Sequence, residues 1–315
     1  MTRVLYVGGF GRSGSTLLDR VLAQIGGCVA VGELVHLPQR GLLDDERCGC
    51  GLAFSACPFW TEVGVAAFGP AGWAGVDAEA IRRQQTALDR NRRIPAMVLP
   101  RWGRRSNETE ALGAWFGRVY AAVADVSGAS VVVDSSKHAS TAFLLRRAPG
   151  LDLRVVHLVR DSRGVAYSWA KRVQRPEVMG AAKAEMPRYG AGRSAAKWLS
   201  YNSLFHLLAA NGVPMLPLRY EQLVSDPRTA LRSVLELAGL DADAEAFGFV
   251  DASGPAVDLA PSHSVAGNPM RFRSGHLELV LDEEWRERMS AGSRSVVTAI
   301  TAPLLTSYGY GRKSA

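Results

Sequence analysis

The stretch from Val4 to Leu22 constrains the fold more than any other, because it joins an apolar run to a glycine-rich loop and the start of an apolar helix. Residues 4–7 form a continuous apolar run of strand length, which is typical of a strand buried on both faces of a parallel sheet. From residue 17 to residue 25 apolar side chains recur at helical spacing, and two glycines end the pattern. Strand, glycine-rich loop and helix in this order form the usual setting in which backbone N–H groups hold a phosphate.

The loop departs from the phosphate-binding pattern of ATPases at one position. Gly9 and Gly14 have the spacing of the motif G-x-x-x-x-G-K-[ST], but Ser15 stands where that motif has its lysine. The lysine normally reaches the β- and γ-phosphates, so this loop can hold one phosphate but is poorly equipped to drive triphosphate cleavage. Arg12 supplies a cation from within the loop, and its planar fork suits an oxyanion. A glycine-rich turn without a ligand is the alternative.

The balance of charges favours an anionic ligand. The chain has 37 lysines and arginines against 30 aspartates and glutamates, a formal net charge of +7. The sequence has neither a dense run of basic residues nor a nucleic-acid-binding motif, so we expect no nucleic acid partner. A small phosphorylated cofactor explains the positive charge equally well. The N-terminus leads directly into the first predicted strand, without a signal peptide, and no apolar run reaches the ~18 residues of a membrane span. We expect a soluble, cytoplasmic protein.

Further patterns predict an α/β organisation over the rest of the chain. Strands are predicted at residues 29–31, 131–134, 153–159 and 213–218, and helices at residues 108–126, 195–211, 229–238 and 282–300. No internal repeat and no proline-rich linker occurs, so we predict a single domain over residues 1–315. Two segments, around 37–76 and 174–193, are predicted to be rich in loops; the second is either a cover near the site or an ordinary surface loop.

Polar residues follow two of these strands at their carboxyl ends, where open α/β sheets place ligands. Glu33 follows the strand at 29–31, and a carboxylate beside a phosphate loop is either a general base or half of a salt bridge to a structural arginine. After the next strand, we expect a functional role for Lys137 and an exposed position without function for His138. Asp134, at the end of the same strand, could mimic the magnesium-holding aspartate of phosphate-loop ATPases.

A second anion site is predicted where the strand at 153–159 ends. Arg160 stands at the strand end, and Ser168 and Arg172 lie four residues apart on the helix that follows, so the three can converge on one anion. A strand-end arginine can also be purely structural. Two anion sites in one sheet imply a ligand that is phosphorylated at both ends.

The four cysteines, Cys28, Cys48, Cys50 and Cys57, lie in the first part of the chain. In a reducing cytoplasm we expect them to be free thiols, and we predict no metal site. The alternative is a zinc knot formed by the last three with His36, although their spacing matches no standard zinc signature closely.

Together these motifs resemble the sulfotransferases that use 3′-phosphoadenosine-5′-phosphosulfate (PAPS) as donor. The loop Gly11–Thr16 is similar to their 5′-phosphosulfate loop, Arg160 through Ser168 to their 3′-phosphate motif, and Arg219–Leu223 with Asp226-Pro227 to a further recurring segment. The motif style is closest to the tyrosylprotein, carbohydrate-type and bacterial enzymes. The resemblance implies a three-layer α/β fold, related to nucleotide kinases, in which helices flank a central parallel sheet.

The resemblance also implies roles for individual residues. Glu33 would be the general base, with His138 as the second candidate, and Arg12 and Lys137 would contact the transferring sulfonate. The residues expected to bind the nucleotide are Gly11, Arg12, Ser13, Gly14, Ser15, Thr16 and Leu17 at the 5′ end, Arg160, Ser168 and Arg172 at the 3′-phosphate, Tyr220 near the nucleotide, and, from a segment that aligns poorly, Arg271 and Arg273.

The expected reaction is in-line transfer of a sulfonate from PAPS, which leaves adenosine 3′,5′-bisphosphate (PAP), to a hydroxyl group of an acceptor. Phenol, sugar, lipid and peptide hydroxyls all remain open as acceptors. A small-molecule kinase of related fold is one alternative, and it would need an equivalent of the missing loop lysine. A phosphonucleotide-binding protein without catalytic activity is the other.

Overall fold

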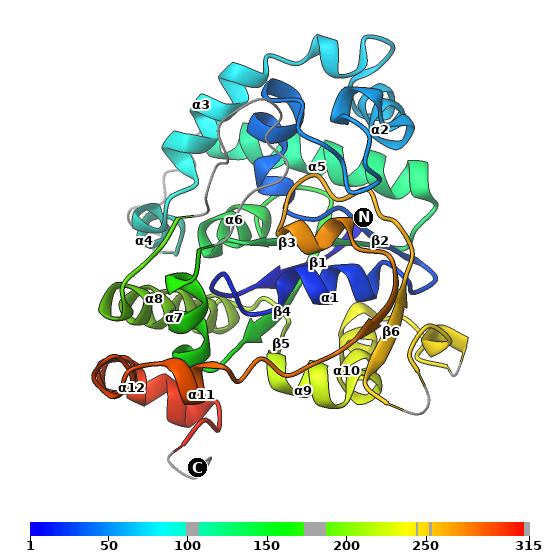
Figure 1. Ribbon diagram of the computed structural model, residues 1–315. Coiled ribbons are helices and arrows are strands. Elements are labelled where there is room, and N and C mark those ends of the chain that lie inside the picture. The colour runs from blue at the N-terminus through cyan, green and yellow to red at the C-terminus, as the bar shows by residue number, and fades with distance from the viewer. Residues whose placement is uncertain (99–106, 173–186, 244, 252–253, 312–315) are drawn as a thin grey trace.

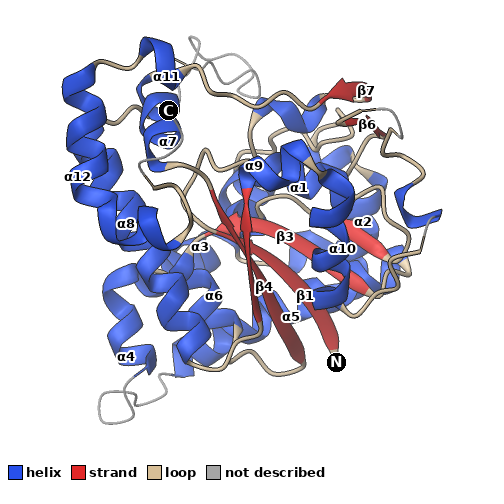
Figure 2. Cartoon of the chain, turned by 90° about the horizontal axis from the view of Figure 1, so that it is seen from below, coloured by secondary structure: helices blue, strands red, loops and turns tan. Residues whose placement is uncertain are grey.

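A five-stranded parallel sheet forms the centre of the protein (Figure 1, Figure 2). The computed structural model describes residues 1–98, 107–172, 187–243, 245–251 and 254–311. The strands are β1 (Thr2–Gly8), β2 (Cys28–Ala30), β3 (Val131–Lys137), β4 (Leu151–Val159) and β5 (Met215–Arg219). They lie in the order β2-β3-β1-β4-β5, and all neighbouring strands run parallel. The predicted α/β class with a central parallel sheet is confirmed.

Helices cover both faces of this sheet, and a short antiparallel pair lies beside it (Figure 2). The helices are α1 (Ser15–Leu22), α2 (Pro58–Phe68), α3 (Ala78–Leu88), α4 (Ile94–Val98), α5 (Asn107–Ser127), α6 (Ala139–Leu145), α7 (Ser162–Ala170), α8 (Ala191–Ala210), α9 (Tyr220–Ser225), α10 (Pro227–Ala238), α11 (Trp285–Arg288) and α12 (Ala291–Ser307). The antiparallel pair consists of β6 (Ala256–Leu259) and β7 (Gly275–Glu278).

The apolar run of β1 is buried on both faces because it lies in the middle of the sheet. Val4 and Tyr6 pack into the core that α5, α6 and α8 cover, while Leu5 and Val7 pack into the opposite core beneath α1, α9 and α10. All four side chains have no exposed surface. Burial of a valine or leucine stabilises the fold by about 1.5–3 kcal/mol, so a strand without polar positions is suited to this central place.

Most predicted elements are confirmed, but the C-terminal helix is not one continuous element. The prediction of a helix at 282–300 is wrong at its start, where α11 ends at Arg288 and α12 begins after Ser290. The Ser290 side chain accepts a hydrogen bond from the Ser293 N–H at 3.3 Å and caps α12. A local serine cap therefore competes with helix continuation, as such side chains commonly do.

The two segments predicted to be rich in loops differ in outcome. The segment 37–76 contains a π-helical turn over Leu37–Leu43 and the helix α2 in addition to loops, and Trp60 of α2 is fully buried. Of the segment 174–193, residues up to 186 lie outside the described residues, and α8 already begins at Ala191. None of the helices in the described part of the chain combines the length and apolar character that a membrane crossing requires.

The strand order brings the predicted site residues to one edge of the sheet. β1 lies between β3 and β4, and Gly8 at its end pairs with both Lys137 and His157. The chain therefore leaves β1, β3 and β4 at neighbouring points, and the loops after these strands meet. Open α/β sheets bind ligands at such carboxyl ends.

Candidate active site

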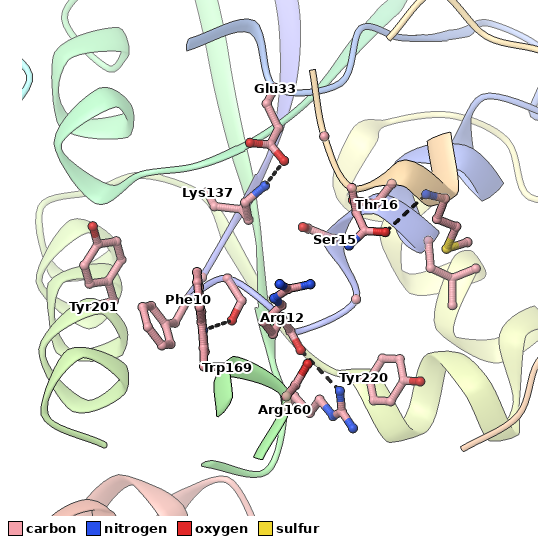
Figure 3. A pocket seen from close by; sticks show the side chains of 18 of the residues that line it. Phe10, Arg12, Ser15, Thr16, Glu33, Lys137, Arg160, Trp169, Tyr201 and Tyr220 are labelled. Atoms are coloured by element: carbon pink, nitrogen blue, oxygen red, sulfur yellow. Dashed lines mark hydrogen bonds and ion pairs between the residues drawn. The ribbon is translucent and has the colours of Figure 1, made fainter. Parts of the chain in front are cut away.

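A cavity of about 560 Å³ lies at the carboxyl ends of β1, β3 and β4 (Figure 3). Its lining comes from the β1–α1 loop, the chain after β2 and β3, the helices α7 and α8, and a later loop around residue 268. The sequence-predicted residues that line it are Gly11, Arg12, Gly14, Ser15, Thr16, Leu17, Glu33, Lys137, His138, Arg160, Ser168 and Tyr220. The two anion sites that were predicted separately thus open into one cavity.

The β1–α1 loop wraps around the N-terminus of α1. Gly14 precedes the helix with φ 89°, and the Leu18 N–H donates to the Gly14 carbonyl oxygen at 3.1 Å. An added Cβ at Gly14 would lie 2.5 Å from Cδ2 of Tyr220, so both conformation and space require glycine. The buried Ser13 hydroxyl donates to the Phe10 carbonyl oxygen at 2.7 Å, which fixes the loop from within rather than pointing to a ligand.

Both cations that the resemblance assigned to the sulfonate have unusual backbone conformations. Arg12 has φ 73° and Lys137 has φ 70°, in the left-handed region that residues other than glycine rarely adopt. Such strain persists where the surrounding structure fixes it, and it is frequent at functional sites. The Arg12 guanidinium lies 5.2 Å from the Trp169 ring, and burial lowers its pKa while Glu33 opposes that effect.

Glu33 lies in the cavity beside two basic groups. It forms an ion pair with Lys137 (Figure 3). The His36 Nε2 lies 3.3 Å from the Glu33 Oε2. Burial would raise the pKa of Glu33, but Lys137 and His36 outweigh it and hold this pKa well below the ordinary value. Glu33 is therefore an ionised carboxylate that faces the cavity, and its salt-bridge partner is Lys137, where sequence analysis had considered an arginine.

His138 lines the same cavity and was expected to be exposed without function, so the expectation of its exposed position is wrong. Burial lowers the pKa of His138 to about 4. Its ring lies 6.0 Å from the His36 ring, edge to face, and its carbonyl oxygen accepts a hydrogen bond from the Tyr6 hydroxyl at 2.8 Å. The imidazole is therefore neutral at neutral pH.

Arg160, predicted to form part of a second anion site, contacts the β1–α1 loop. Its Nη1 donates to the Arg12 carbonyl oxygen at 3.3 Å, and its guanidinium lies 4.8 Å from the Tyr220 ring centroid (Figure 3). Its Nη2 lies 3.0 Å from the Asp282 carboxylate, which sequence analysis did not single out. Ser168 lines the cavity, whereas Arg172 is exposed and lies outside the described lining.

Arg271 and Arg273 lie elsewhere. Arg271 is buried, and its guanidinium donates to the carbonyl oxygens of Ser264 at 3.0 Å and Arg47 at 2.8 Å. Both arginines line a separate cavity of about 520 Å³. The loop between them and Ser264 nevertheless reaches the site, because Asn268 lines the main cavity.

Asp134 is a structural carboxyl group rather than a cavity residue. It has no exposed surface, and the Tyr120 hydroxyl, the Ser136 N–H (2.8 Å) and the Leu34 N–H (3.4 Å) donate to it. Burial raises the pKa of Asp134. It lies outside the described lining of the cavity, so the position that would hold magnesium in a phosphate-loop ATPase is here part of the core.

The structure adds residues that sequence analysis missed. These are His36, Arg40, Trp169, Tyr189, Lys197, Tyr201, Asn268 and Asp282. Trp169 donates from Nε1 to the Gly11 carbonyl oxygen at 3.1 Å and stacks on Phe10 at a centroid distance of 5.6 Å. The spacing of Lys197 and Tyr201, one turn apart on α8, put them on one face but did not say what that face meets.

Comparisons with known proteins relate the chain to one family and one fold. The model described as "Sulfotransferase family" matches residues 5–244. The sulfotransferase domain from the Synechococcus PCC 7002 olefin synthase is 19% identical with a TM-score of 0.53, over 96% of this chain and 94% of that chain. The sulfotransferase domain from the curacin biosynthetic pathway is 15% identical with a TM-score of 0.51, over 96% and 98%. No curated protein matches the chain.

Proposed function

The chain belongs to the sulfotransferase family, and we propose that it transfers a sulfonate group from PAPS to a hydroxyl group of an acceptor. The predicted family and the predicted sulfotransferase fold are confirmed. The observation that carries the proposal is that the Arg12 loop and the Arg160 corner, predicted as separate anion sites, line one cavity together with Glu33 and Lys137.

The chemistry of the lining fits such a donor. Five cationic side chains among the described lining residues surround the cavity, together with the N-terminus of α1: Arg12, Arg40, Lys137, Arg160 and Lys197. The donor supplies the sulfonate, and its two phosphorylated ends require positive charge at two places. We assign the 5′ end to the Arg12 loop and the 3′-phosphate to Arg160 and Ser168.

Glu33 is the proposed general base. Lys137 holds the pKa of Glu33 low, so the carboxylate is a weak base as long as the ion pair is intact. A sulfonate near Lys137 would share the ammonium charge, and the burial that raises the pKa of Glu33 would then act with less opposition. The carboxylate would thus gain basicity when the site is filled, and it would accept the proton of the acceptor hydroxyl.

Arg12 and Lys137 are the proposed electrostatic stabilisers. Their cationic groups reach the cavity from the ends of neighbouring strands, and charge that develops on the sulfonate and on the leaving oxygen would face them. The acceptor hydroxyl belongs to a small molecule, a sugar, a lipid or a peptide.

Calorimetry tests the proposal. PAP should bind the purified protein with about one site per chain, and Arg160→Ala should weaken that binding by about tenfold or more, because the charged contact to a phosphate is lost. ATP with magnesium should release less heat. Transfer of labelled sulfate from PAPS to an acceptor mixture should accompany binding.

The outcomes separate the alternatives. Tighter binding of ATP with magnesium than of PAP would favour the kinase, and PAP binding without sulfate transfer to any acceptor would favour a silent binding protein. Absence of heat with PAP would end the proposal.

A further inference from the structure

Away from the cavity, three thiols and one imidazole meet at a single point. The Cys57 Sγ lies 3.3 Å and the Cys48 Sγ 3.8 Å from the His263 Nδ1, and the Sγ atoms of Cys50 and Cys57 are 3.7 Å apart. All four donor atoms lie within 4.8 Å of one another. His36, which sequence analysis considered as the fourth ligand, lies beside Glu33 instead.

The separations of 3.3, 3.7 and 3.8 Å are close to the edges of a tetrahedron around zinc. Zn–S bonds of about 2.3 Å and Zn–N bonds of about 2.0–2.1 Å imply S···S edges of about 3.8 Å and S···N edges of about 3.6 Å. Three thiolates and one imidazole form a complete ligand set of the structural kind, which leaves no open position for a substrate. A Cys50–Cys57 disulfide would leave Cys48 and His263 without a role, whereas a metal uses all four.

Three of the four ligands, Cys48, Cys57 and His263, are positioned by contacts other than those within the cluster. The Cys48 N–H donates to the Leu52 carbonyl oxygen at 2.8 Å, in a turn that Gly51 completes with φ 94°. An added Cβ at Gly49 would lie 2.7 Å from the Ser262 carbonyl oxygen, so only glycine lets the two segments approach this closely.

Cys57 and His263 are positioned by α2. Cys57 immediately precedes this helix, and the His263 ring stacks on Phe59 at a centroid distance of 4.6 Å. The Trp60 Nε1 donates to the His263 carbonyl oxygen at 2.9 Å. The fold itself therefore orients three of the four ligands, which lowers the entropic cost of binding an ion.

We propose that Cys48, Cys50, Cys57 and His263 bind one structural Zn²⁺ ion, with the imidazole bound through Nδ1. The ion would bind three of the four cysteines, all of which are free of disulfide bonds in the structure, as thiolates. It joins residues 48–57 to the loop that starts at 261, two segments that run side by side near α2 (Figure 1).

The ion would also stabilise a wall of the active-site cavity. The loop that carries His263 continues to Ala266, whose carbonyl oxygen accepts the Glu33 N–H at 3.2 Å, and to Asn268 in the cavity lining. Loss of the ion would leave this loop with fewer constraints beside Glu33. The zinc site itself does not depend on which reaction the cavity catalyses.

Metal analysis of the full-length protein, purified from zinc-supplemented cells without chelator, tests the proposal. We expect about one zinc per chain, retained in Cys28→Ser and lost in Cys57→Ser. Cys28 is the matched control, because it is the cysteine outside the cluster. Removal of zinc by a chelator should lower Tm by about 5 °C or more, and added Zn²⁺ should restore it.

A second measurement does not depend on a variant that folds. Titration of the chelator-treated wild-type protein with Co²⁺ should give tetrahedral d–d bands and a thiolate-to-cobalt charge-transfer band that saturates at one equivalent. Less than about a tenth of an equivalent of zinc together with no such band would overturn the proposal. A Cys50–Cys57 disulfide in the freshly purified protein, found by mass spectrometry, would overturn it as well.

Discussion

At the scale of single residues, Glu33 combines burial with a strong local charge balance. Lys137 and His36 stabilise its ionised form more than burial opposes it, so the carboxylate stays charged in a largely buried place. A removed carboxylate would leave Lys137 without this partner, and a removed lysine would leave Glu33 as a buried charge that burial pushes toward protonation.

Glu33→Gln is therefore expected to lower kcat by ~100-fold or more, because the amide has nearly the same shape but cannot accept a proton. Steady-state sulfate transfer measures the effect, and PAP affinity should stay within a few-fold of the wild-type value. Glu79→Gln, which alters an exposed carboxylate on α3, is the control and should leave turnover unchanged. Full activity in Glu33→Gln would remove the base assignment but leave the family untouched.

At the scale of elements, the β1–α1 loop depends on Tyr220 at the start of α9. The ring of Tyr220 lies against Gly14 on one side and beneath the Arg160 guanidinium on another. The loop that would hold the 5′ end and the corner that would hold the 3′-phosphate thus both pack against the Tyr220 ring. We therefore expect a substitution in one of them to alter the position of the other.

Gly14→Ala should reveal this coupling. The new Cβ meets Tyr220 at 2.5 Å in a backbone conformation with φ 89°, which costs a residue with a side chain about 1–2 kcal/mol. We expect Tm to fall by several degrees and PAP affinity to fall by about tenfold. Gly26→Ala is the matched control, because nothing lies within 4 Å of its added Cβ. Equal PAP affinity in the two variants would contradict the coupling.

Local sequence patterns predicted most helices and strands, but they did not predict contacts between residues far apart in the sequence. The buried run at residues 4–7 and the loop after it were readable because strand, glycines and helix follow one another directly. The partner of Arg160 was not readable, since Asp282 lies 122 positions away and no spacing links the two. His263 was not predicted as a partner of the cysteines for the same reason, because 206 positions separate it from Cys57. His36, which is nearer in sequence, contacts Glu33 instead.

At the scale of the whole molecule, buried histidines make stability depend on pH. His157 in β4 is almost fully buried, and its Nε2 lies 2.8 Å from the Oδ1 of Asn202 in α8. Burial lowers the pKa of His157 to about 4, and the hydrogen bond to Asn202 only partly opposes this. In the unfolded chain a histidine has a pKa near 6.5 and therefore binds its proton at a higher pH than the folded protein does. The free energy of unfolding therefore falls as the pH decreases from about 6.5 to about 4.

Replacement of this histidine should flatten the pH dependence. The wild-type protein is expected to lose roughly 2–3 kcal/mol of unfolding free energy from His157 between pH 7.5 and pH 4.5, and His157→Gln should lack that share. Urea denaturation at the two pH values measures the difference for each protein. An identical loss in both proteins would show that His157 has the same pKa in the folded and unfolded states, which would contradict the prediction.

The central position of β1 has a consequence for synthesis on the ribosome. β1 is made first, yet its neighbours begin only at Val131 and Leu151. At about 5–20 residues per second, translation delivers the last of these strands about 8–30 s later. Until then the nascent chain carries an apolar segment whose two backbone edges have no strand partner, and the loop after it lacks the neighbouring strand ends that it meets in the folded protein.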